Sequence, residues 1–287
     1  MRSRRFDANR PRIEEVRMDL GLKGRTCVVT GASRGIGAET ARLLCAEGAN
    51  VVLVARNEER LRAATDAATA AGAATGGRAE SLVLDVTDAN AGERMLATAT
   101  EHFGALDVLV NNAGSAQWRD LDDVPDEDWR AQYELNVMAP LRAIRAAAPP
   151  MAERGWGRIV NVCSTAGKRP SAAMPEYSVA KAAELSLSRL FADRYAKSGV
   201  LVNAICPGPV ESEMWMEPGG LLDQSQQMSG DASREDALAT AGSKRPIGRL
   251  AESAEIAGAI AFLCSERASY VSGAAWSVDG GTVQVII

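Results

Sequence analysis

The 287-residue sequence predicts an α/β protein built as a single doubly wound domain, with a seven-stranded parallel sheet flanked by helices on both faces. Three observations lead to this prediction. Short apolar runs alternate with alanine-rich segments of helical length, each run is apolar almost throughout, and a glycine-rich turn directly follows the first run. A parallel sheet covered on both faces accounts for all three.

The predicted strands are seven runs rich in valine, isoleucine and leucine. In chain order they read RTCVVT, NVVLVA, ESLVLD, LDVLVN, GRIVNVC, GVLVNAIC and AAWSV. The segments between them, such as LRAATDAATAAGAA, have high helix propensity and the length of right-handed crossovers. We therefore expect crossover helices between successive strands.

Composition excludes several classes of protein. A net charge of −5 argues against a general nucleic-acid binder, and no apolar run reaches the ~18 residues that a bilayer span needs. Five scattered cysteines without a C-x-x-C pair fit a reducing compartment. The single histidine, His102, leaves neither a zinc site nor a Ser-His-Asp triad easy to assemble. We expect a cytoplasmic protein with no metal and no nucleic-acid or membrane partner.

A glycine-rich turn, TGASRGIG at residues 30–37, follows the first strand and opens a helix. Its glycines let the backbone approach a pyrophosphate, while the free N–H groups and the dipole at the helix start attract negative charge. The spacing is G-x3-G-x-G and not the usual G-x-G-x-x-G, so the prediction rests on the strand before and the helix after. This context predicts a dinucleotide site in a Rossmann-like domain.

The end of the second strand indicates which dinucleotide binds. It reads Ala55-Arg56-Asn57, where an acidic residue would accept hydrogen bonds from a ribose 2′-hydroxyl. Arg56, together with Arg34 from the glycine turn, is instead suited to a 2′-phosphate. We predict NADP(H) in preference to NAD(H); the alternative is that both arginines only cover the adenine face.

The chain divides by composition into two parts, and the second contains a distinct segment. Residues 1–20 are expected to form a flexible basic arm, because many arginines and few apolar residues cannot order such a segment. Residues 21–287 are expected to form the Rossmann-like domain, and Met18, just before it, is hypothesised to be a translation start. Within the domain, residues 209–246 are rich in Gly, Ser, Met and acidic residues and are expected to form a mobile lid with one or two short helices.

Tyr177 and Lys181 lie four residues apart at the start of an amphipathic segment, so they project from one face of a helix. A nearby ammonium favours the phenolate and lowers the pKa of a tyrosine, which makes Tyr177 a candidate general acid. Taken alone, the pair is better explained as a packed ring beside a solvated amine. The remaining motifs favour the chemical interpretation.

The sequence resembles the short-chain dehydrogenase/reductases, and among them the members that reduce 3-oxoacyl groups on acyl carrier protein. The resemblance runs from about Gly21 to the C-terminus, with Pro209 and Ser212 as small departures where the family commonly has a bulkier apolar residue and a threonine. The motifs occur in the family's order: TGASRGIG (30–37), Asp85 in LDVTD, NNAG (111–114), Asn136 in ELNV, Ser164 in NVCSTAG, YSVAK (177–181), PGPVES (207–212) and VDGG (278–281).

This resemblance implies hydride transfer between a nicotinamide cofactor and a ketone or secondary alcohol. Tyr177 would donate a proton to the substrate carbonyl, and Ser164 would hydrogen-bond the same oxygen. Lys181 would lower the pKa of Tyr177 and bind the nicotinamide ribose, and Asn136 would hold a water in a proton relay. The candidate cofactor contacts, from the glycine turn, the second strand and the family motifs together, are Gly31, Ser33, Arg34, Gly35, Ile36, Gly37, Arg56, Asp85, Val86, Asn112, Ala113, Gly114, Tyr177, Lys181, Pro207, Gly208, Val210 and Ser212.

The substrate is less well indicated by the sequence. We expect an apolar pocket whose five candidate lining residues include no Arg or Lys, which favours aliphatic or alicyclic ketones over small anionic substrates. Its candidate lining residues are Trp118, Met174, Met214, Trp215 and Met216.

A 3-oxoacyl thioester of acyl carrier protein or CoA is the first choice of substrate, and a free sugar, polyol or alicyclic alcohol is the alternative. A non-catalytic NADP(H)-binding regulator is the alternative from another class, but such a sensor needs none of the proton-transfer groups. The resemblance also implies a homotetramer, or else a homodimer.

Overall fold

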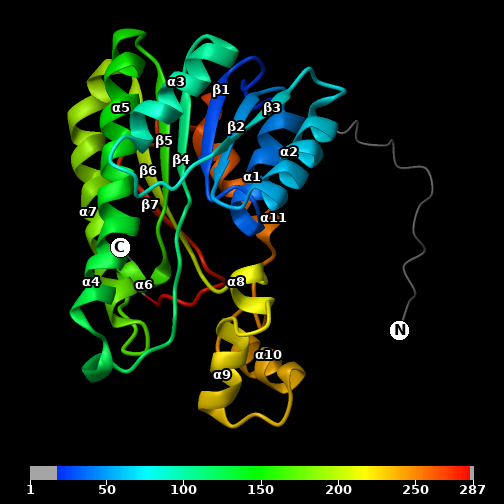
Figure 1. Cartoon of the computed structure of the whole chain (residues 1–287), viewed down its shortest axis with the longest axis vertical. Coiled ribbons are helices and arrows are strands. Elements are labelled where there is room, and N and C mark those ends of the chain that lie inside the picture. The colour runs from blue at the N-terminus through cyan, green and yellow to red at the C-terminus, as the bar shows by residue number, and fades with distance from the viewer. Residues whose placement is uncertain (1–17, 285–287) are drawn as a thin grey trace, which may run out of the picture.

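The computed structural model describes residues 18–284, which form a parallel sheet between two layers of helices (Figure 1). The predicted basic arm falls mainly on residues 1–17, which lie outside the described residues, as do residues 285–287. Of the arm's last residues, Leu20 packs against the apolar core, and the backbone carbonyl of Asp19 accepts a 2.7 Å hydrogen bond from Arg267. The folded part therefore includes residues 19 and 20.

The sheet confirms the predicted fold class. Its seven parallel strands have the order β3-β2-β1-β4-β5-β6-β7, so the chain winds outwards from β1 in one direction and then from β4 in the other. The strands are β1 (Thr26–Thr30), β2 (Asn50–Ala55), β3 (Arg78–Val83), β4 (Val108–Asn111), β5 (Gly157–Val162), β6 (Val200–Pro207) and β7 (Ala275–Val278).

Strand register places the switch in winding direction at the carboxyl end of β1. Thr30 pairs with Val54 on β2, and Val29 pairs with Val110 on β4, so the three strands end close together. In open α/β sheets the crevice at such a switch point is where ligands bind. The glycine turn begins immediately after Thr30, at that crevice.

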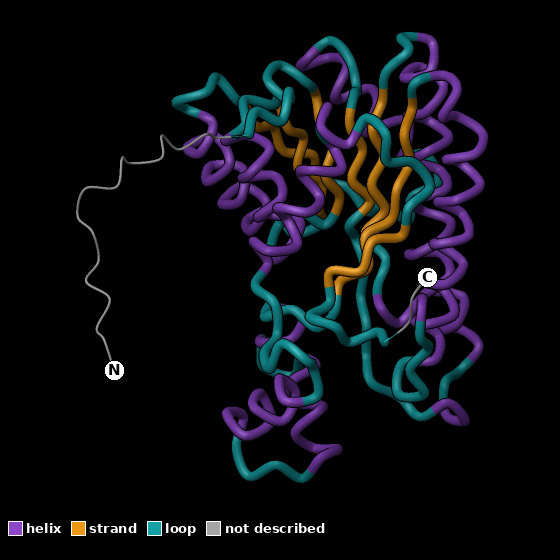
Figure 2. The backbone as a smooth tube through the Cα atoms, turned by 180° about the vertical axis from the view of Figure 1, so that it is seen from behind, coloured by secondary structure: helices purple, strands orange, loops and turns teal. Residues whose placement is uncertain are grey.

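Two helical layers cover the sheet, which Figure 2 shows between them. Alternate side chains of β1 point to opposite faces: Val29 packs in one apolar cluster with Leu44 and Ile256, and Val28 packs in another with Met95 and Ile144. The first face carries α1 (Gly35–Ala46), α2 (Glu58–Gly72) and α11 (Ser253–Cys264), and the second carries α3 (Ala91–Phe103), α5 (Ala139–Glu153) and α7 (Pro175–Tyr195). None of the helices within residues 18–284 is long and apolar enough to cross a membrane.

The segment expected to be a lid forms a small lobe beyond the carboxyl ends of the strands (Figure 1). It contains three helices where one or two were expected: α8 (Glu213–Met216), α9 (Leu221–Ser229) and α10 (Arg234–Ser243). Its apolar cluster, distinct from those under the sheet, consists of Trp215, Leu221, Leu222, Ala237, Ala241 and Leu250. Ala116 and Trp118, from the segment after β4, also pack against this cluster and connect the lobe to the main body.

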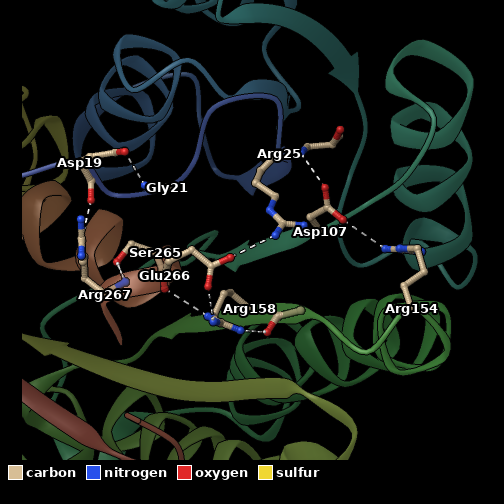
Figure 3. Close-up of polar contacts among 11 residues, drawn as sticks. Asp19, Gly21, Arg25, Asp107, Arg154, Arg158, Ser265, Glu266 and Arg267 are labelled. Carbon is tan, nitrogen blue, oxygen red and sulfur yellow. Dashed lines mark hydrogen bonds and ion pairs between the residues drawn. The ribbon is translucent and has the colours of Figure 1, made fainter. Parts of the chain in front are cut away.

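The amino end of the sheet is held by a polar cluster (Figure 3). Glu266 bridges Arg25 at 3.1 Å and Arg158 at 3.6 Å, and both guanidinium groups lie over the ring of Trp156. Arg158 is 3% exposed, so these partners replace its lost hydration. This cluster stabilises the end of the sheet opposite the switch point.

Shorter elements complete the chain: α4 (Asp126–Tyr133), a π-helical turn (Glu134–Met138) that continues into α5, α6 (Thr165–Lys168), and 3₁₀ turns at Leu121–Asp123, Ala196–Ser198 and Glu266–Ala268.

Candidate active site

Two adjoining clefts open at the carboxyl ends of the strands. The first, of about 740 Å³, is lined by the glycine turn and the ends of β2, β3 and β4; we call it the glycine cleft. The second, of about 530 Å³, is lined by the ends of β5 and β6, the start of α7 and the lid; we call it the tyrosine cleft. Their walls share Ile36, Asn112, Gly114, Ser212 and Met214, so the two form one continuous groove.

The glycine turn is shaped for close approach of a ligand to the backbone. Gly31 and Gly35 have φ values of 64° and 55°, in the left-handed region that favours glycine. A Cβ at Gly37 would lie 2.5 Å from Nδ2 of Asn112, so this glycine lets α1 pack tightly against the turn after β4. No side chain caps the start of α1 at Arg34, which leaves its first N–H groups available to an anion.

The structure brings nearly all the predicted cofactor residues to this groove. Within residues 18–284, the exception is Gly37, which lines neither cleft. The glycine cleft is lined by Gly31, Ser33, Arg34, Gly35, Ile36, Arg56, Asp85, Val86, Asn112, Ala113, Gly114 and Ser212, and the tyrosine cleft by Tyr177, Lys181, Pro207, Gly208 and Val210.

Three arginines gather at the end of β2, where sequence analysis singled out two. Arg60, in the first turn of α2, lines the glycine cleft with Arg34 and Arg56. Its position one turn after the end of β2 was the signal that could have revealed it. Arg56 is 79% exposed and lies 3.4 Å from Asp85, whose pKa is lowered mainly by the backbone N–H of Thr87. This end of the groove is rich in guanidinium groups.

Ser164, Tyr177 and Lys181 meet on the wall of the tyrosine cleft. The Oγ of Ser164 accepts a 3.1 Å hydrogen bond from the N–H of Ala166 and so caps α6, while its hydroxyl also contacts Tyr177. Nζ of Lys181 lies 5.8 Å from the centre of the Tyr177 ring and donates a 2.9 Å hydrogen bond to the carbonyl of Val162. Ser164 can therefore cap α6 and contact Tyr177 at the same time.

Burial governs the acidity of Tyr177. It raises the pKa of the phenol above its ordinary value, and Lys181 and Ser164 lower it without offsetting the effect of burial. The ammonium acts in the direction that sequence analysis predicted, but the net direction is upward. Burial has the largest single effect on Lys181 and lowers its pKa, but Glu184, a buried neighbour that sequence analysis missed, together with Tyr177 and Cys163 raises it, and the net direction is upward.

Asn136 lies behind the groove and does not line it. It is fully buried in the π-helical turn, where its Nδ2 donates to the carbonyl of Gln132 at 3.0 Å and to the side chain of Gln132 at 2.7 Å. Its Oδ1 is buried without a hydrogen-bond partner. A Cβ placed on Gly114 would be 3.4 Å from this Oδ1 and 3.9 Å from Nζ of Lys181, so both groups face the same glycine.

Four of the five residues predicted to line the substrate pocket share one cleft. Trp118, Met174, Met214 and Trp215 line the tyrosine cleft, whereas Met216 packs against the lid cluster. The lid therefore supplies part of the cleft wall, and its apolar residues serve both packing and lining.

Cationic side chains also line the tyrosine cleft, whereas the candidate lining residues expected from the sequence were all apolar. Besides Lys181, they are Arg169 from the end of α6 and Lys244 and Arg245 from the end of α10. No Asp or Glu is among the described residues that line it. Arg169 is close to Met174 in sequence, whereas Lys244 and Arg245 are far from every apolar candidate and reach the cleft only through folding.

Comparison with known proteins gives a consistent result. Residues 25–219 match the short chain dehydrogenase family. The chain is 34% identical over 266 residues to a 3-oxoacyl-[acyl-carrier-protein] reductase FabG of Vibrio cholerae, covering 93% of this chain and 100% of that protein. It is also 34% identical over 264 residues to a D-beta-hydroxybutyrate dehydrogenase of Cupriavidus necator, covering 91% and 99%.

Solved structures show the same similarity in three dimensions. L-sorbose reductase from Gluconobacter frateurii, complexed with NADPH and L-sorbose, superposes with a TM-score of 0.86 at 33% identity, covering 94% of this chain and 100% of that chain. A levodione reductase superposes with a TM-score of 0.83 at 28% identity, covering 92% and 99%.

Proposed function

Because this chain belongs to the short-chain dehydrogenase family and is an NAD(P)-dependent oxidoreductase acting on CH–OH groups, we propose that it reduces the ketone of a 3-oxoacyl thioester with NADPH. The observation that carries the proposal is the meeting of Ser164, Tyr177 and Lys181 on the wall of a cleft continuous with the glycine cleft. The continuous groove would allow a dinucleotide held at the glycine turn to reach Tyr177 with its nicotinamide.

The residues of the groove fit the cofactor. The glycine turn and the uncapped start of α1 would hold the pyrophosphate, and Pro207, Gly208 and Lys181 would hold the nicotinamide half. When bound, NADPH supplies the hydride that reduces the carbonyl carbon. The protein's part is to hold the reacting groups in position and to supply the proton.

We assign the proton to the hydroxyl of Tyr177, which donates it to the carbonyl oxygen as negative charge develops there. Ser164 donates a hydrogen bond to the same oxygen. The ammonium of Lys181 stabilises the phenolate that remains, and the orphaned Oδ1 of Asn136 beside Gly114 supports a water-mediated path that reprotonates it. In the direction of oxidation the phenolate acts as the base.

The preference for NADP(H) rests on Arg34, Arg56 and Arg60 at the end of β2, since a 2′-phosphate needs such donors. The similar L-sorbose reductase was solved with NADPH, and the similar YwfH is described as an NADPH dependent reductase; both descriptions support this choice. A change of Arg56 to Asp is expected to shift preference towards NADH.

The choice of a thioester substrate rests on the walls of the tyrosine cleft. Trp118, Met174 and Trp215 offer apolar surface to an acyl chain, and the cations Arg169 and Lys244 suit the phosphate groups of CoA or of the pantetheine arm on acyl carrier protein. A free sugar or polyol is the second candidate, because of the L-sorbose reductase similarity. The full proton-transfer set disfavours a non-catalytic regulator.

We also propose that the protein forms a homotetramer or homodimer and is cytoplasmic. Val179 and Leu190 on α7 are 53% and 67% exposed, and Trp276 on β7 is 39% exposed, which supports burial of these faces in a homotetramer or homodimer. All five cysteines are buried and unpaired, which supports a reducing, cytoplasmic location.

The proposal is tested by following NADPH and NADH consumption with acetoacetyl-CoA, a neutral alicyclic diketone and L-sorbose. We expect the highest kcat/KM with acetoacetyl-CoA and NADPH. Preference for NADH would contradict the cofactor assignment, preference for L-sorbose would contradict the thioester assignment, and the absence of turnover with every carbonyl compound would contradict the catalytic role.

A further inference from the structure

One carboxylate of the lid contacts two of the three arginines that line the glycine cleft. Oε2 of Glu217 accepts a 2.5 Å hydrogen bond from Nη1 of Arg34, and its Oε1 lies 2.9 Å from Nη1 of Arg60. Glu217 directly follows α8, whereas Arg34 belongs to the glycine turn and Arg60 to α2. One side chain of the lid thus bridges two elements of the main body.

These contacts use the donors that a phosphate would need. Carboxylates and phosphates both bind guanidinium groups through paired, charge-assisted hydrogen bonds. Arg34 and Arg60 line the glycine cleft next to Arg56, at the strand end where the 2′ position of the ribose is recognised. The Glu217 carboxylate and a 2′-phosphate therefore require the same pair of guanidinium groups.

We propose that Glu217 is a specificity-determining residue: its carboxylate competes with the 2′-phosphate of NADP(H) for Arg34 and Arg60, and so reduces the preference for NADP(H) over NAD(H). The inference rests on the proposed NADP(H)-dependent function and adds Arg60 to the phosphate-binding residues. NAD(H) has no 2′-phosphate, so its binding leaves the Glu217 contacts in place.

The competition operates at neutral pH. The hydrogen bond from Arg34 lowers the pKa of Glu217 below its ordinary value, so the carboxylate is ionised throughout the neutral range. The side chains of Glu217, Arg34 and Arg60 are 37%, 41% and 50% exposed, and water therefore weakens each ion pair. The expected effect on affinity is a few-fold, which leaves a 2′-phosphate able to displace the carboxylate.

Displacement of the Glu217 carboxylate from both arginines would also weaken the attachment of the lid to the main body. Glu217 is joined to the helix that carries Met214 and Trp215 into the tyrosine cleft. When a 2′-phosphate takes both arginines, the lid loses two contacts with the main body. Amide exchange in residues 213–220 is therefore expected to rise with adenosine 2′,5′-bisphosphate and not with 5′-AMP.

The direct test is the change of Glu217 to Gln, which keeps the shape of the side chain and removes its charge. Glu211→Gln is the matched control, because Glu211 is an exposed acid of the same segment that lines neither cleft. Dissociation constants for NADPH, NADH and adenosine 2′,5′-bisphosphate are measured by titration calorimetry on the wild type and on both variants.

For Glu217→Gln, we expect the ratio of the NADH to the NADPH dissociation constant to rise about three- to tenfold, and adenosine 2′,5′-bisphosphate to bind more tightly by a similar factor. Glu211→Gln should leave the ratio within about twofold of wild type, because distant exposed charges are screened. In an Arg34→Gln/Arg60→Gln background, Glu217→Gln should no longer change the ratio.

An unchanged or lower ratio in Glu217→Gln, with NADPH still bound by wild type, would overturn this inference and leave the proposed function standing. Failure of the wild-type protein to bind NADPH at all would overturn the cofactor assignment itself, and this inference with it.

Discussion

Nζ of Lys181 donates a 2.7 Å hydrogen bond to Oε2 of Glu184, one turn later on α7, and the two side chains are only 3% and 1% exposed. A buried ammonium beside a phenol needs such a partner, because burial by itself favours loss of its proton. The carboxylate keeps Lys181 charged, and the carbonyl of Val162 accepts a second hydrogen bond from it. The pair therefore both stabilises α7 and determines the charge next to Tyr177.

Replacement of Glu184 by Leu is expected to lower the free energy of unfolding by about 3–5 kcal/mol, because it leaves a buried ammonium without its counter-charge. Urea unfolding measures the change. The double variant Lys181→Met/Glu184→Leu is the control, since removal of both charges should recover much of the loss. If the single variant were as stable as wild type, the pair would not be buried as described.

Replacement of Tyr177 by Phe should reduce kcat by about 10²–10⁴-fold, because the proton donor is removed while the ring remains. NADPH binding should persist, and a fluorescence titration of the cofactor checks this separately from turnover. Near wild-type turnover in this variant would exclude Tyr177 as the acid.

The pH dependence should follow the raised pKa of Tyr177. Reduction needs the protonated phenol, so its rate should stay constant through the neutral range and fall only in alkaline solution, as the pKa is passed. Oxidation needs the phenolate, so its rate should keep increasing with pH through the alkaline range. Steady-state profiles in both directions measure the two limbs, and an oxidation rate that levels off below pH ~7 would contradict the upward shift.

Removal of positive charge from the tyrosine cleft should affect anionic substrates most. Arg169→Gln and Lys244→Gln are each expected to lower kcat/KM for acetoacetyl-CoA by about three- to tenfold, with a smaller effect on a neutral ketone. The ratio of the two kcat/KM values is the measured quantity. An equal effect on both substrates would indicate that these residues only support the structure.

The amino end of the sheet should contribute to stability and not to turnover. Arg158→Met removes the ion pair with Glu266 and the stacking on Trp156, and we expect a loss of about 2–4 kcal/mol in the free energy of unfolding. Because Arg158 lies at the opposite end of β5 from Ser164, kcat/KM should remain near wild type. A large loss of turnover by the folded variant would contradict this separation.

Most of the architecture was predictable because it depends on local patterns. Nearly continuous apolar runs such as NVVLVA predict strands covered on both faces, and the glycines of residues 30–37 predict the turn that follows β1. The four-residue spacing of Tyr177 and Lys181 likewise brings them to one helical face. Each of these features is encoded within a few residues, so no knowledge of distant contacts was needed.

The site's electrostatics were less predictable. Nothing in the sequence singled out Glu184, because its burial against Lys181 depends on the packing of α7 on the sheet. The net rise in the pKa of Tyr177 has the same origin, because burial is a property of the packed chain. Arg169 and Lys244 share a cleft although they are 75 positions apart in the sequence.

The sequence by itself determined the order of strands and helices, the glycine turn after β1 and the placing of Tyr177 and Lys181 on one face of α7, because spacing and residue type specify these locally. Only the tertiary structure decided which charges lie close together: Glu217 against Arg34 and Arg60, Glu184 against Lys181, and the cations that line the tyrosine cleft. The physical reason is that Coulomb energies and desolvation depend on distance and burial in space, which segments far apart in the chain acquire only by folding together.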